Sequence, residues 1–263
     1  MGTAREIIKA VAKKVGVYQW TRTRKDLTYR ALRDSKLATR FLEKRLLRKF
    51  GDKIPMLINE FEDSDLLSYI DSELAKVSNH LHGVSSPLNL RALYVLCRAI
   101  KPNNFVETGV ASGASSFVIL RALEKNRKGH LYSIDLPPGN WDKDKTSYRE
   151  IDHVTLPEDK EPGWIVPDKL RQRWILILGD SKEKLEPLLE QLGQIDIFYH
   201  DAEHTYQAML WEYQTVWPYI STGGVLCSDD VTWNRAFATF KEQIGRCGRA
   251  KRWFDFGMIR KVS

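Results

Sequence analysis

The feature that most constrains the fold of this chain is the stretch of residues 104–116, Asn-Phe-Val-Glu-Thr-Gly-Val-Ala-Ser-Gly-Ala-Ser-Ser. A short apolar strand is predicted to end at Glu107, a loop with glycines at positions 109 and 113 follows, and a helix is predicted to begin near Ser115. Glycines let the backbone approach a ligand closely because they carry no Cβ. A strand, an acid, a glycine loop and a helix in this order are typical of sites for nucleotide-type cofactors.

The acid at position 107 indicates which cofactor such a loop would hold. Dinucleotide sites use three glycines, G-x-G-x-x-G, so that a pyrophosphate can lie at the helix N-terminus. Here Ala111 stands at the middle position, and the carboxylate that ends the strand would repel a pyrophosphate. The same carboxylate would attract a ligand with an ammonium and a sulfonium group, which describes S-adenosylmethionine. The alternative is a plain strand-to-helix turn of an α/β domain.

From residue 104 onward, short apolar strands alternate with helical patterns. Strands are predicted at 104–107, 130–135, 174–178, 195–200 and 224–229. Helices are predicted at 113–125, 181–192, 203–217 and 233–245, and residues 252–261 are expected to form a hairpin or a pair of edge strands. This alternation predicts an α/β fold, with a mostly parallel sheet covered by helices on both faces.

Residues 1–85 are predicted to form an all-α segment that precedes the domain of residues 86–263. Helices are expected at 4–17, 24–49, 63–79 and from Ser86-Pro87 to about residue 100. Gly51 and Pro55 are expected to break the second run, and Asp63 or Ser64 is expected to cap the third. Because apolar residues recur at helical spacing, we expect this segment to pack on the sheet domain or on another copy of itself, giving a homo-oligomer.

The charge of the chain is unevenly distributed. Residues 1–50 hold 15 Lys and Arg but only 4 Asp and Glu, and since the whole chain carries +7, the remainder carries −4. A basic arm of this kind can contact an anionic membrane, nucleic acid or an acidic partner. The simpler interpretation, which we favour, is a solvated helix face whose long side chains cover a packed seam. Nucleic acid is not an expected partner.

Composition indicates a soluble, cytoplasmic protein, with peripheral contact to a membrane as an extension. No apolar run approaches the ~20 residues needed to span a bilayer, and no apolar signal core precedes a cleavage site. The three cysteines, Cys97, Cys227 and Cys247, are far apart in the sequence and are expected to be reduced thiols.

Residues 137–170 interrupt the alternation. They are rich in Pro, Asp and Lys and include Trp141, Tyr148 and Trp164. Connections of this length inside a compact domain are usually functional, so we predict a lid over cofactor or acceptor. The alternative is a disordered insertion, against which the aromatic residues argue.

In an open parallel sheet, ligands bind at the carboxyl ends of the strands. The strands that follow Glu107 are predicted to end in Asp135, in Gly179-Asp180-Ser181, in Asp201 with His204 nearby, and in Asp229-Asp230. Asp135 is placed to accept from two ribose hydroxyls, and residues 179–181 are placed beside an adenine edge. Asp180 and Asp230 could instead cap the next helices. Acids at five strand ends of one sheet indicate a site.

Asp201, Asp229 and Asp230 are the candidate metal ligands, because an all-oxygen set suits a hard cation such as Mg²⁺. The alternative is a set of solvated loop acids. His204 is the candidate general base, since histidine titrates near neutral pH, and a packing histidine is the alternative. His200 is expected to be structural.

Five motifs in this order resemble class I S-adenosylmethionine-dependent methyltransferases, and more narrowly the small-molecule and sugar O-methyltransferase branch around macrocin O-methyltransferase and the related cephalosporin-biosynthesis protein. The motifs are Val-Glu-Thr-Gly-Val-Ala-Ser-Gly-Ala-Ser (106–115), Ser-Ile-Asp-Leu (133–136), Leu-Gly-Asp-Ser (178–181), His-Asp-Ala-Glu-His-Thr-Tyr (200–206) and Gly-Gly-Val-Leu-Cys-Ser-Asp-Asp (223–230).

The resemblance implies a Rossmann-like sheet of seven strands with the last strand antiparallel. It implies that Glu107 holds the methionine ammonium through a hydrogen-bond network, and that the acidic triad Asp201, Asp229 and Asp230 binds Mg²⁺. The full set of cofactor residues that it implies is Glu107, Thr108, Gly109, Ala111, Gly113, Ser115, Asp135, Leu136, Gly179, Asp180, Ser181 and Asp201. Catechol-type relatives place a lysine base after the first metal aspartate, whereas Ala202, Glu203 and His204 follow here.

The sequence therefore predicts a metal-assisted O-methyltransferase whose acceptor is a small hydroxylated molecule such as a sugar or glycan, with Asp201 and His204 as catalytic residues. Two rivals stay open at this point. One is a nicotinamide-dependent oxidoreductase, which the glycine pattern disfavours. The other is a non-enzymatic protein that binds nucleic acid or anionic lipid through its basic arm.

Overall fold

The structure is a computed structural model that describes residues 35–77, 85–137, 156–157 and 159–263. The helix predicted at 4–17 and the first part of the one predicted at 24–49 lie outside the described residues. Within the described ranges, no helix is long and apolar enough to cross a membrane.

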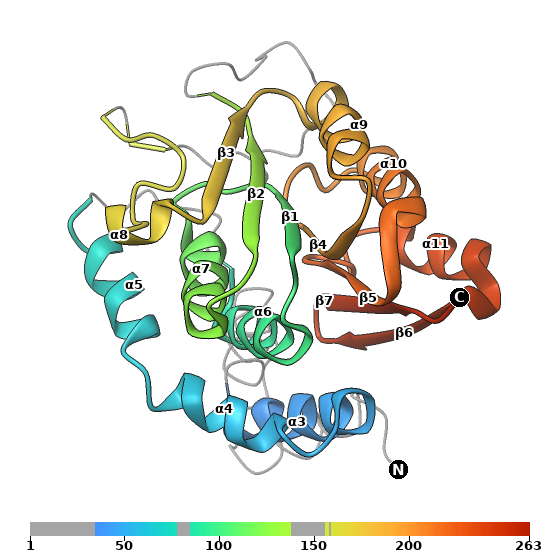
Figure 1. Ribbon diagram of the computed structural model, residues 1–263, viewed down its shortest axis with the longest axis horizontal. Coiled ribbons are helices and arrows are strands. Elements are labelled where there is room, and N and C mark those ends of the chain that lie inside the picture. Colours follow the sequence, from blue (N-terminus) through green and yellow to red (C-terminus); the bar gives the residue numbers. More distant parts are fainter. Residues whose placement is uncertain (1–34, 78–84, 138–155, 158) are drawn as a thin grey trace, which may run out of the picture.

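The centre of the molecule is a seven-stranded sheet with the order β3-β2-β1-β4-β5-β7-β6 (Figure 1). Its strands are β1 (Asn104–Thr108), β2 (His130–Asp135), β3 (Trp174–Leu178), β4 (Ile195–His200), β5 (Ile220–Ser228), β6 (Gly248–Trp253) and β7 (Phe256–Lys261). Strands β1 to β5 are parallel, and β7 runs antiparallel to both β5 and β6. The predicted mostly parallel sheet, with a hairpin from the C-terminal residues, is confirmed.

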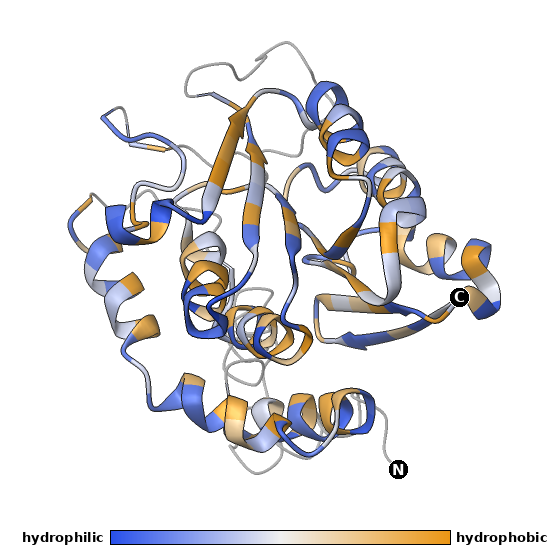
Figure 2. Cartoon of the chain, in the orientation of Figure 1, coloured by the Kyte–Doolittle hydropathy of each residue, from blue (hydrophilic) through white to orange (hydrophobic). Residues whose placement is uncertain are grey.

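Helices cover both faces of this sheet because successive strand residues point to opposite sides. Phe105 belongs to an apolar core shared with the helices α3 to α8, whereas its neighbour Val106 belongs to a second core shared with α9, α10 and α11. Figure 2 shows apolar residues along the strands and on the helix sides that face the sheet. The helices are α3 (Lys36–Phe50), α4 (Ile54–Glu62), α5 (Leu66–Leu74), α6 (Pro87–Ile100), α7 (Ala114–Asn126), α8 (Asp168–Arg171), α9 (Ser181–Leu192), α10 (Tyr206–Val216) and α11 (Ala236–Ile244).

Helix starts follow local capping chemistry. Ser86 accepts a hydrogen bond from the backbone N–H of Asn89, and Pro87 occupies the first position of α6, as the sequence predicts. Thr205 caps α10, which therefore begins at residue 206 and not at 203.

The predicted break after the second helical run is confirmed at Gly51, which is the C-cap residue of α3. Pro55 lies in the first turn of a further helix, α4, which the sequence did not predict and where a missing N–H costs nothing. The N-cap residue of α5 is Asp65, which makes no side-chain cap hydrogen bond. Of the two predicted caps, Ser64 contributes: its hydroxyl accepts from the backbone N–H of Leu66 (3.4 Å), the first residue of α5.

The described part of the 137–170 connection lies along the glycine loop. The backbone N–H of Gly163 donates to the carbonyl of Ala111 (2.8 Å), and that of Ile165 donates to the carbonyl of Ser112 (3.2 Å). The hydroxyl of Tyr69 in α5 donates to the carbonyl of Ile165 (2.9 Å). Residues 138–155 and 158, including Trp141 and Tyr148, lie outside the described residues, so the lid stays a prediction.

The packing of α4 against α6 generates a stability prediction. Phe61 is 2% exposed, and its ring lies 5.5 Å from that of Tyr94. Phe61→Ala should lower the free energy of unfolding by about 3–5 kcal/mol, because it leaves a cavity in the core. The matched control is Met56→Ala on the same helix, where the side chain is 59% exposed, and it should change stability by less than about 0.5 kcal/mol. Equal effects in urea denaturation would show that α4 does not share this core.

Candidate functional site

The glycine loop after β1 lies directly against the end of β4. Gly109 has φ +84°, and a Cβ at this position would lie 2.0 Å from the backbone oxygen of Asp201. Gly113, with φ +93°, is the N-cap residue of α7, and a Cβ there would lie 2.7 Å from the Cα of Gly163. Both positions therefore require glycine for backbone conformation and for space. Ala111 between them also adopts positive φ, at +49°.

Asp135 at the end of β2 holds this loop in place. Its Oδ2 accepts hydrogen bonds from the backbone N–H groups of Val110 (3.1 Å) and Ala111 (2.8 Å), and its Oδ1 accepts one from Leu136 (2.8 Å). Burial raises the pKa of Asp135, while these three donors oppose the rise. The contact of this carboxylate with a ribose stays a prediction, and the structure shows that Asp135 holds the glycine loop through its backbone.

Glu107 is fully buried between β1, β2 and α7. Its Oε2 accepts hydrogen bonds from Ser116 (2.6 Å) and Ser133 (2.8 Å), whereas its Oε1 has no hydrogen-bond partner. Burial raises the pKa of Glu107 to about 7, although bonds from Ser115, Ser116 and Ser133 act in the opposite direction. Half of a buried carboxylate thus remains available to a donor or a cation.

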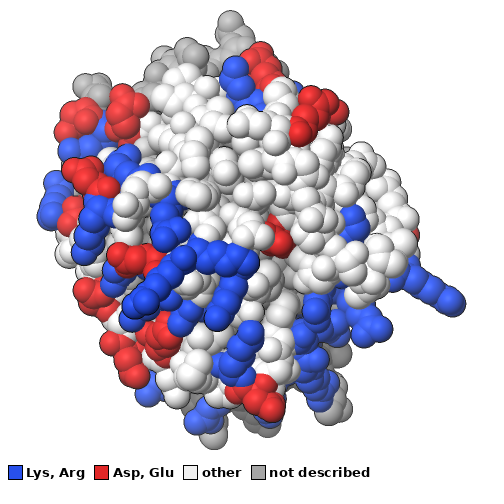
Figure 3. All heavy atoms as spheres, viewed as in Figure 1, with Lys and Arg blue, Asp and Glu red and all other residues white. Residues whose placement is uncertain are grey.

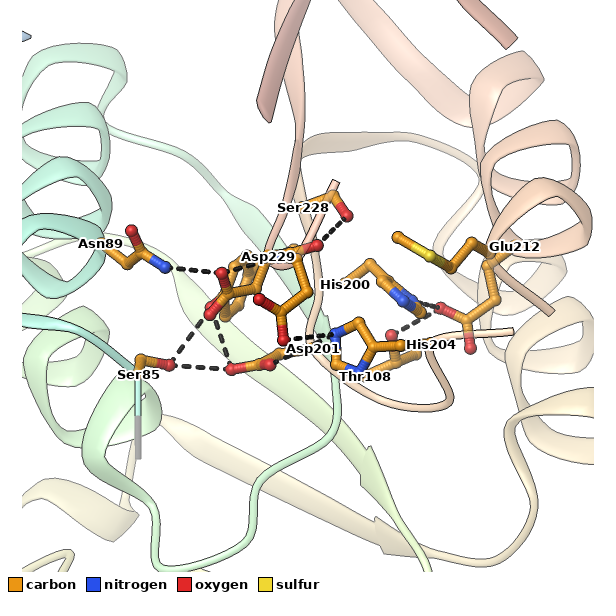
Figure 4. Close-up of polar contacts among 12 residues, drawn as sticks. Ser85, Asn89, Thr108, His200, Asp201, His204, Glu212, Ser228 and Asp229 are labelled. Atoms are coloured by element: carbon orange, nitrogen blue, oxygen red, sulfur yellow. Dashed lines mark hydrogen bonds and ion pairs between the residues drawn. The ribbon is translucent and has the colours of Figure 1, made fainter. Parts of the chain in front are cut away.

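Carboxylates gather at the ends of β4 and β5 (Figure 4). Asp201 Oδ2 accepts from the hydroxyls of Ser85 (2.8 Å) and Tyr199 (3.0 Å). Asp229 Oδ1 accepts from the side-chain amide of Asn89 (2.7 Å) and from the backbone N–H of Asp230 (2.7 Å). Burial, and then the charges of Asp229 and Asp230, raise the pKa of Asp201 well above its ordinary value.

The composition of this acidic cluster differs from the predicted triad. Carboxylate oxygens of Asp229, Asp230 and Asp255 lie within 4.8 Å of one another, whereas Asp201 is not part of that close group. Asp255 lies in the turn between β6 and β7. No sequence pattern placed this turn near the acidic cluster. The turn lies here because β7 pairs with β5 and brings the hairpin back to the strand that carries Asp229.

His204 lies beside the acidic cluster. Its Nε2 is 3.8 Å from Asp201 Oδ1 and 3.9 Å from Asp230 Oδ2, and it forms no hydrogen bond. Burial and the neighbouring ring of His200 lower the pKa of His204 to about 3, so its imidazole is neutral at neutral pH. Ionised carboxylates at these distances would act in the opposite direction and make it a stronger base.

A buried network lies beneath the loop. Glu212 Oε2 accepts from the hydroxyl of Thr108 (2.6 Å) and lies 2.7 Å from His200 Nδ1. Burial alone would raise the pKa of Glu212, but His200, Thr108 and Ser181 lower this pKa overall. The side chain of Thr108 therefore points away from the glycine loop, toward Glu212. His200, which was expected to be structural, contacts the same carboxylate.

The end of β3 serves two purposes. Asp180 Oδ1 accepts from the backbone N–H of Lys182 (2.9 Å), so Asp180 caps α9. The backbone N–H of Gly179 donates to the carbonyl of Asp135 (2.8 Å), which places residues 179–181 beside the end of β2. The cap alternative is thus confirmed for Asp180, and a cap does not prevent contact with a ligand.

Comparison with known families matches part of the chain. Residues 106–231 match the model of a family described as a methyltransferase domain. This part of the chain therefore carries a methyltransferase domain. A search of curated proteins finds no match to the sequence.

Solved structures share the fold of this methyltransferase domain. The chain is similar to an S-adenosylhomocysteine-bound methyltransferase of Podospora anserina, with 14% identity, a TM-score of 0.54 and coverage of 94% of this chain and 99% of that one. An O-methyltransferase of Bacillus cereus in complex with S-adenosylhomocysteine gives 16% identity, a TM-score of 0.51 and coverage of 76% and 91%. The O-methyltransferase TomG of Streptomyces achromogenes, involved in tomaymycin synthesis and solved with S-adenosylmethionine, gives 15% identity and a TM-score of 0.50, with coverage of 76% of this chain and 91% of that one. At these identities the likeness concerns the fold.

The site of the methyltransferase domain includes residues that sequence reasoning missed. Ser85 lies just before α6 and Asn89 lies in its first turn, both outside residues 106–231. The other missed residues are Tyr199 in β4, Glu212 in α10 and Asp255 in the turn between β6 and β7. The cap signal at Ser86-Pro87 located the start of α6. No pattern in the sequence indicated that this first turn faces the acidic cluster, because such proximity arises only from tertiary packing.

The close approach of Gly109 to Asp201 generates a prediction. Gly109→Ala should lower the free energy of unfolding by more than about 3 kcal/mol, because the new methyl meets backbone that cannot move aside. The control is Gly193→Ala, at φ +65° with nothing within 4 Å of the added Cβ, which should cost about 1 kcal/mol of strain. Denaturant titration of both variants measures the difference in free energy of unfolding. Equal losses of stability in the two variants would contradict the close approach of Gly109 to Asp201.

Proposed function

We propose that this protein is an O-methyltransferase that moves the methyl group of S-adenosylmethionine to a small hydroxylated acceptor such as a sugar or glycan. The observation that carries the proposal is the contact between the glycine loop and the end of β4. It sets a loop suited to a cofactor beside an acidic cluster suited to an acceptor hydroxyl. Adjacent placement of two reactants is the main requirement of a direct group transfer.

The residues around the loop fit a cationic methyl donor. Glu107 Oε1 is a buried acceptor without a partner, and a buried carboxylate of this kind favours an ammonium group. Gly109 and Gly113 keep the loop free of side chains. The proposed binding set is Glu107, Thr108, Gly109, Ala111, Gly113, Ser115, Asp135, Leu136, Gly179, Asp180, Ser181 and Asp201, with Thr108 contributing through its backbone.

The acidic cluster fits a hard divalent cation. Its donors are all carboxylate oxygens, the ligands that Mg²⁺ prefers. We propose Asp201, Asp229 and Asp230 as ligands, and the close grouping of oxygens adds Asp255 as a fourth candidate. When bound, such an ion would orient an acceptor hydroxyl and lower its pKa. Asn89 and Ser85 hold two of the carboxylates in position through the hydrogen bonds described above.

The chemistry of the proposed step is simple. The acceptor oxygen forms a bond to the methyl carbon while the bond between that carbon and the donor sulfur breaks. The products are a methyl ether and S-adenosylhomocysteine, and the hydroxyl proton must leave the acceptor. We propose His204, whose Nε2 has no hydrogen bond, as the group that receives this proton. Because its pKa is lowered to about 3, it can act as a base only when Asp201, 3.8 Å away, is ionised and stabilises the imidazolium.

The two rival functions are not favoured. A nicotinamide cofactor would place a pyrophosphate near Glu107, which would be repelled when the carboxylate is ionised. A purely non-enzymatic role would leave the acidic cluster and the shaped glycine loop without a purpose. The sugar or glycan acceptor is proposed from the sequence motifs of residues 200–206 and 223–230.

Binding of the cofactor should depend on pH through Glu107. An ammonium near this carboxylate favours its ionised form, so binding lowers the raised pKa of Glu107 and releases a proton. The affinity for S-adenosylhomocysteine should therefore rise about tenfold between about pH 6 and pH 8.

The control variant is Glu107→Gln, which should bind more weakly and lose most of this pH dependence. Calorimetry in buffers with different ionisation enthalpies measures the released proton directly. NADH serves as the competing ligand: binding of NADH without binding of S-adenosylhomocysteine would overturn the proposed function.

Metal binding should depend on Asp229. Asp229→Asn should weaken Mg²⁺ or Mn²⁺ binding by at least about tenfold, because it removes a negative charge while the amide can still accept from Asn89. Affinity for S-adenosylhomocysteine should change less than about twofold, since the loop residues are untouched. Asp168→Asn, at a fully exposed carboxylate, is the control and should bind metal as the parent protein does. Unchanged metal affinity in Asp229→Asn would contradict the proposed metal site.

A further inference from the structure

The outer face of α3 combines positive charge with exposed apolar side chains. Helical spacing places one set of exposed residues on a single side, opposite the buried Ala38, Leu42 and Leu46. We call this side the α3 face. It consists of Lys36, Leu37, Arg40, Phe41, Lys44 and Arg48.

The cations of the α3 face have no role in holding the described fold together. Within the described part of the chain, none of Lys36, Arg40, Lys44 and Arg48 forms an ion pair, and α3 contains one acid, Glu43. Stabilisation of the helix dipole can explain the basic residues of the last turn, Arg48 and Lys49, but not those at the start and middle of the helix. The remaining cations are therefore available to an anionic partner.

The positive surface continues beyond the helix onto the sheet edge. Burial lowers the pKa of Lys49, and the nearby charges of Arg249, Lys251 and Arg260 lower it further. Lys and Arg atoms predominate at the lower right of Figure 3, over the elements that Figure 1 labels α3 and β6. The carbonyl of Lys49 accepts from Arg260 Nη1 (2.8 Å), so α3 is fastened to β7.

Two apolar side chains distinguish the α3 face from an ordinary cationic surface. Leu37 is 50% exposed and Phe41 is 39% exposed, one turn apart among the four cations. The guanidinium carbon of Arg45 lies 4.4 Å from the centre of the Phe41 ring. Phosphate-binding surfaces for nucleic acid need cations but gain little from exposed leucine and phenylalanine, whereas helices that lie in a membrane interface need both.

We propose that the α3 face binds the surface of an anionic lipid bilayer. Lys36, Arg40, Lys44 and Arg48 contact lipid phosphates, and Leu37 and Phe41 insert between the headgroups. A second copy of this chain is a poorer occupant, because a symmetric contact would bring two positive faces together. The binding is peripheral and does not depend on methyl transfer.

The test is partition of the full-length protein onto vesicles of phosphatidylcholine alone or mixed with phosphatidylglycerol. The protein should bind the mixed vesicles, bind the neutral ones weakly, and dissociate as salt concentration rises. The double variant Arg40→Glu with Lys44→Glu should lower the partition coefficient at least about tenfold, and Leu37→Ser with Phe41→Ser should lower it severalfold.

The matched control is Lys125→Glu with Lys128→Glu, which makes the same change in charge at the exposed end of α7 and beyond it. It should lose much less binding than the α3 variant. Circular dichroism and S-adenosylhomocysteine affinity verify that each variant is folded, so failure here is distinguishable from failure of the proposed function.

Three outcomes would overturn the proposal. One is equal partition onto neutral and mixed vesicles, and another is loss of binding that is the same in the α3 variant and in the α7 control. The third is a protein that binds neither kind of vesicle but binds duplex DNA, or that forms a Leu37-dependent dimer in sedimentation experiments.

Discussion

The backbone hydrogen bond from Asp201 to the carbonyl of Thr108 (2.9 Å) joins the two strands at which the order of the sheet reverses. At this reversal the connections of β1 and β4 lead to opposite faces of the sheet, and in open parallel sheets ligands bind beyond the strand ends at such a point. The approach of the two strand ends leaves no space for a Cβ at position 109. The glycine loop, the ends of β4 and β5, and the buried network under Thr108 all take their positions from this contact.

Buried carboxylates are the main energetic cost of this arrangement. Glu107 and Glu212 are fully buried and Asp229 is nearly so, and a buried charge is tolerated only where donors surround it. Glu212 meets this requirement with Thr108, Ser181 and His200, and its pKa falls. Glu107 meets it only in part, and its pKa rises to about 7. The difference is the one expected between a carboxylate that supports the fold and one placed for a ligand, which is the role proposed for Glu107.

The sequence predicted the sheet well because each element carried a local signal. Parallel central strands are apolar on both faces, and the strand ends at residues 135, 178 and 200 agree with the prediction. Boundaries failed where a local signal has two meanings. Pro55 serves as a breaker inside a helix and as a favourable residue in its first turn, and only the structure shows which applies.

The site was predictable only as far as it follows from strand ends. Glu107, Asp135, Asp201 and Asp229 were found because parallel strands deliver their last residues to one edge. Asp255 and Asn89 could not be found in this way, since one lies in an antiparallel hairpin and the other in a helix that precedes the sheet. Their proximity depends on long-range packing, which short sequence patterns do not encode.

The described helices of the N-terminal segment, within residues 35–77, are packed against the sheet domain. Lys53 Nζ donates to the carbonyl of Ala99 (2.7 Å), and Arg260 donates both to Lys49 in α3 and to Gly223 in β5. Arg260 thereby links α3 to β5, the strand that immediately precedes Asp229. Because rigid elements connect the α3 face to the acidic cluster, any surface that binds the helix also fixes the orientation of the site. The uneven charge of the chain, positive before residue 50 and negative after it, fits the two proposals together: the basic helix would face an anionic surface, and the acidic part would attract a cationic cofactor.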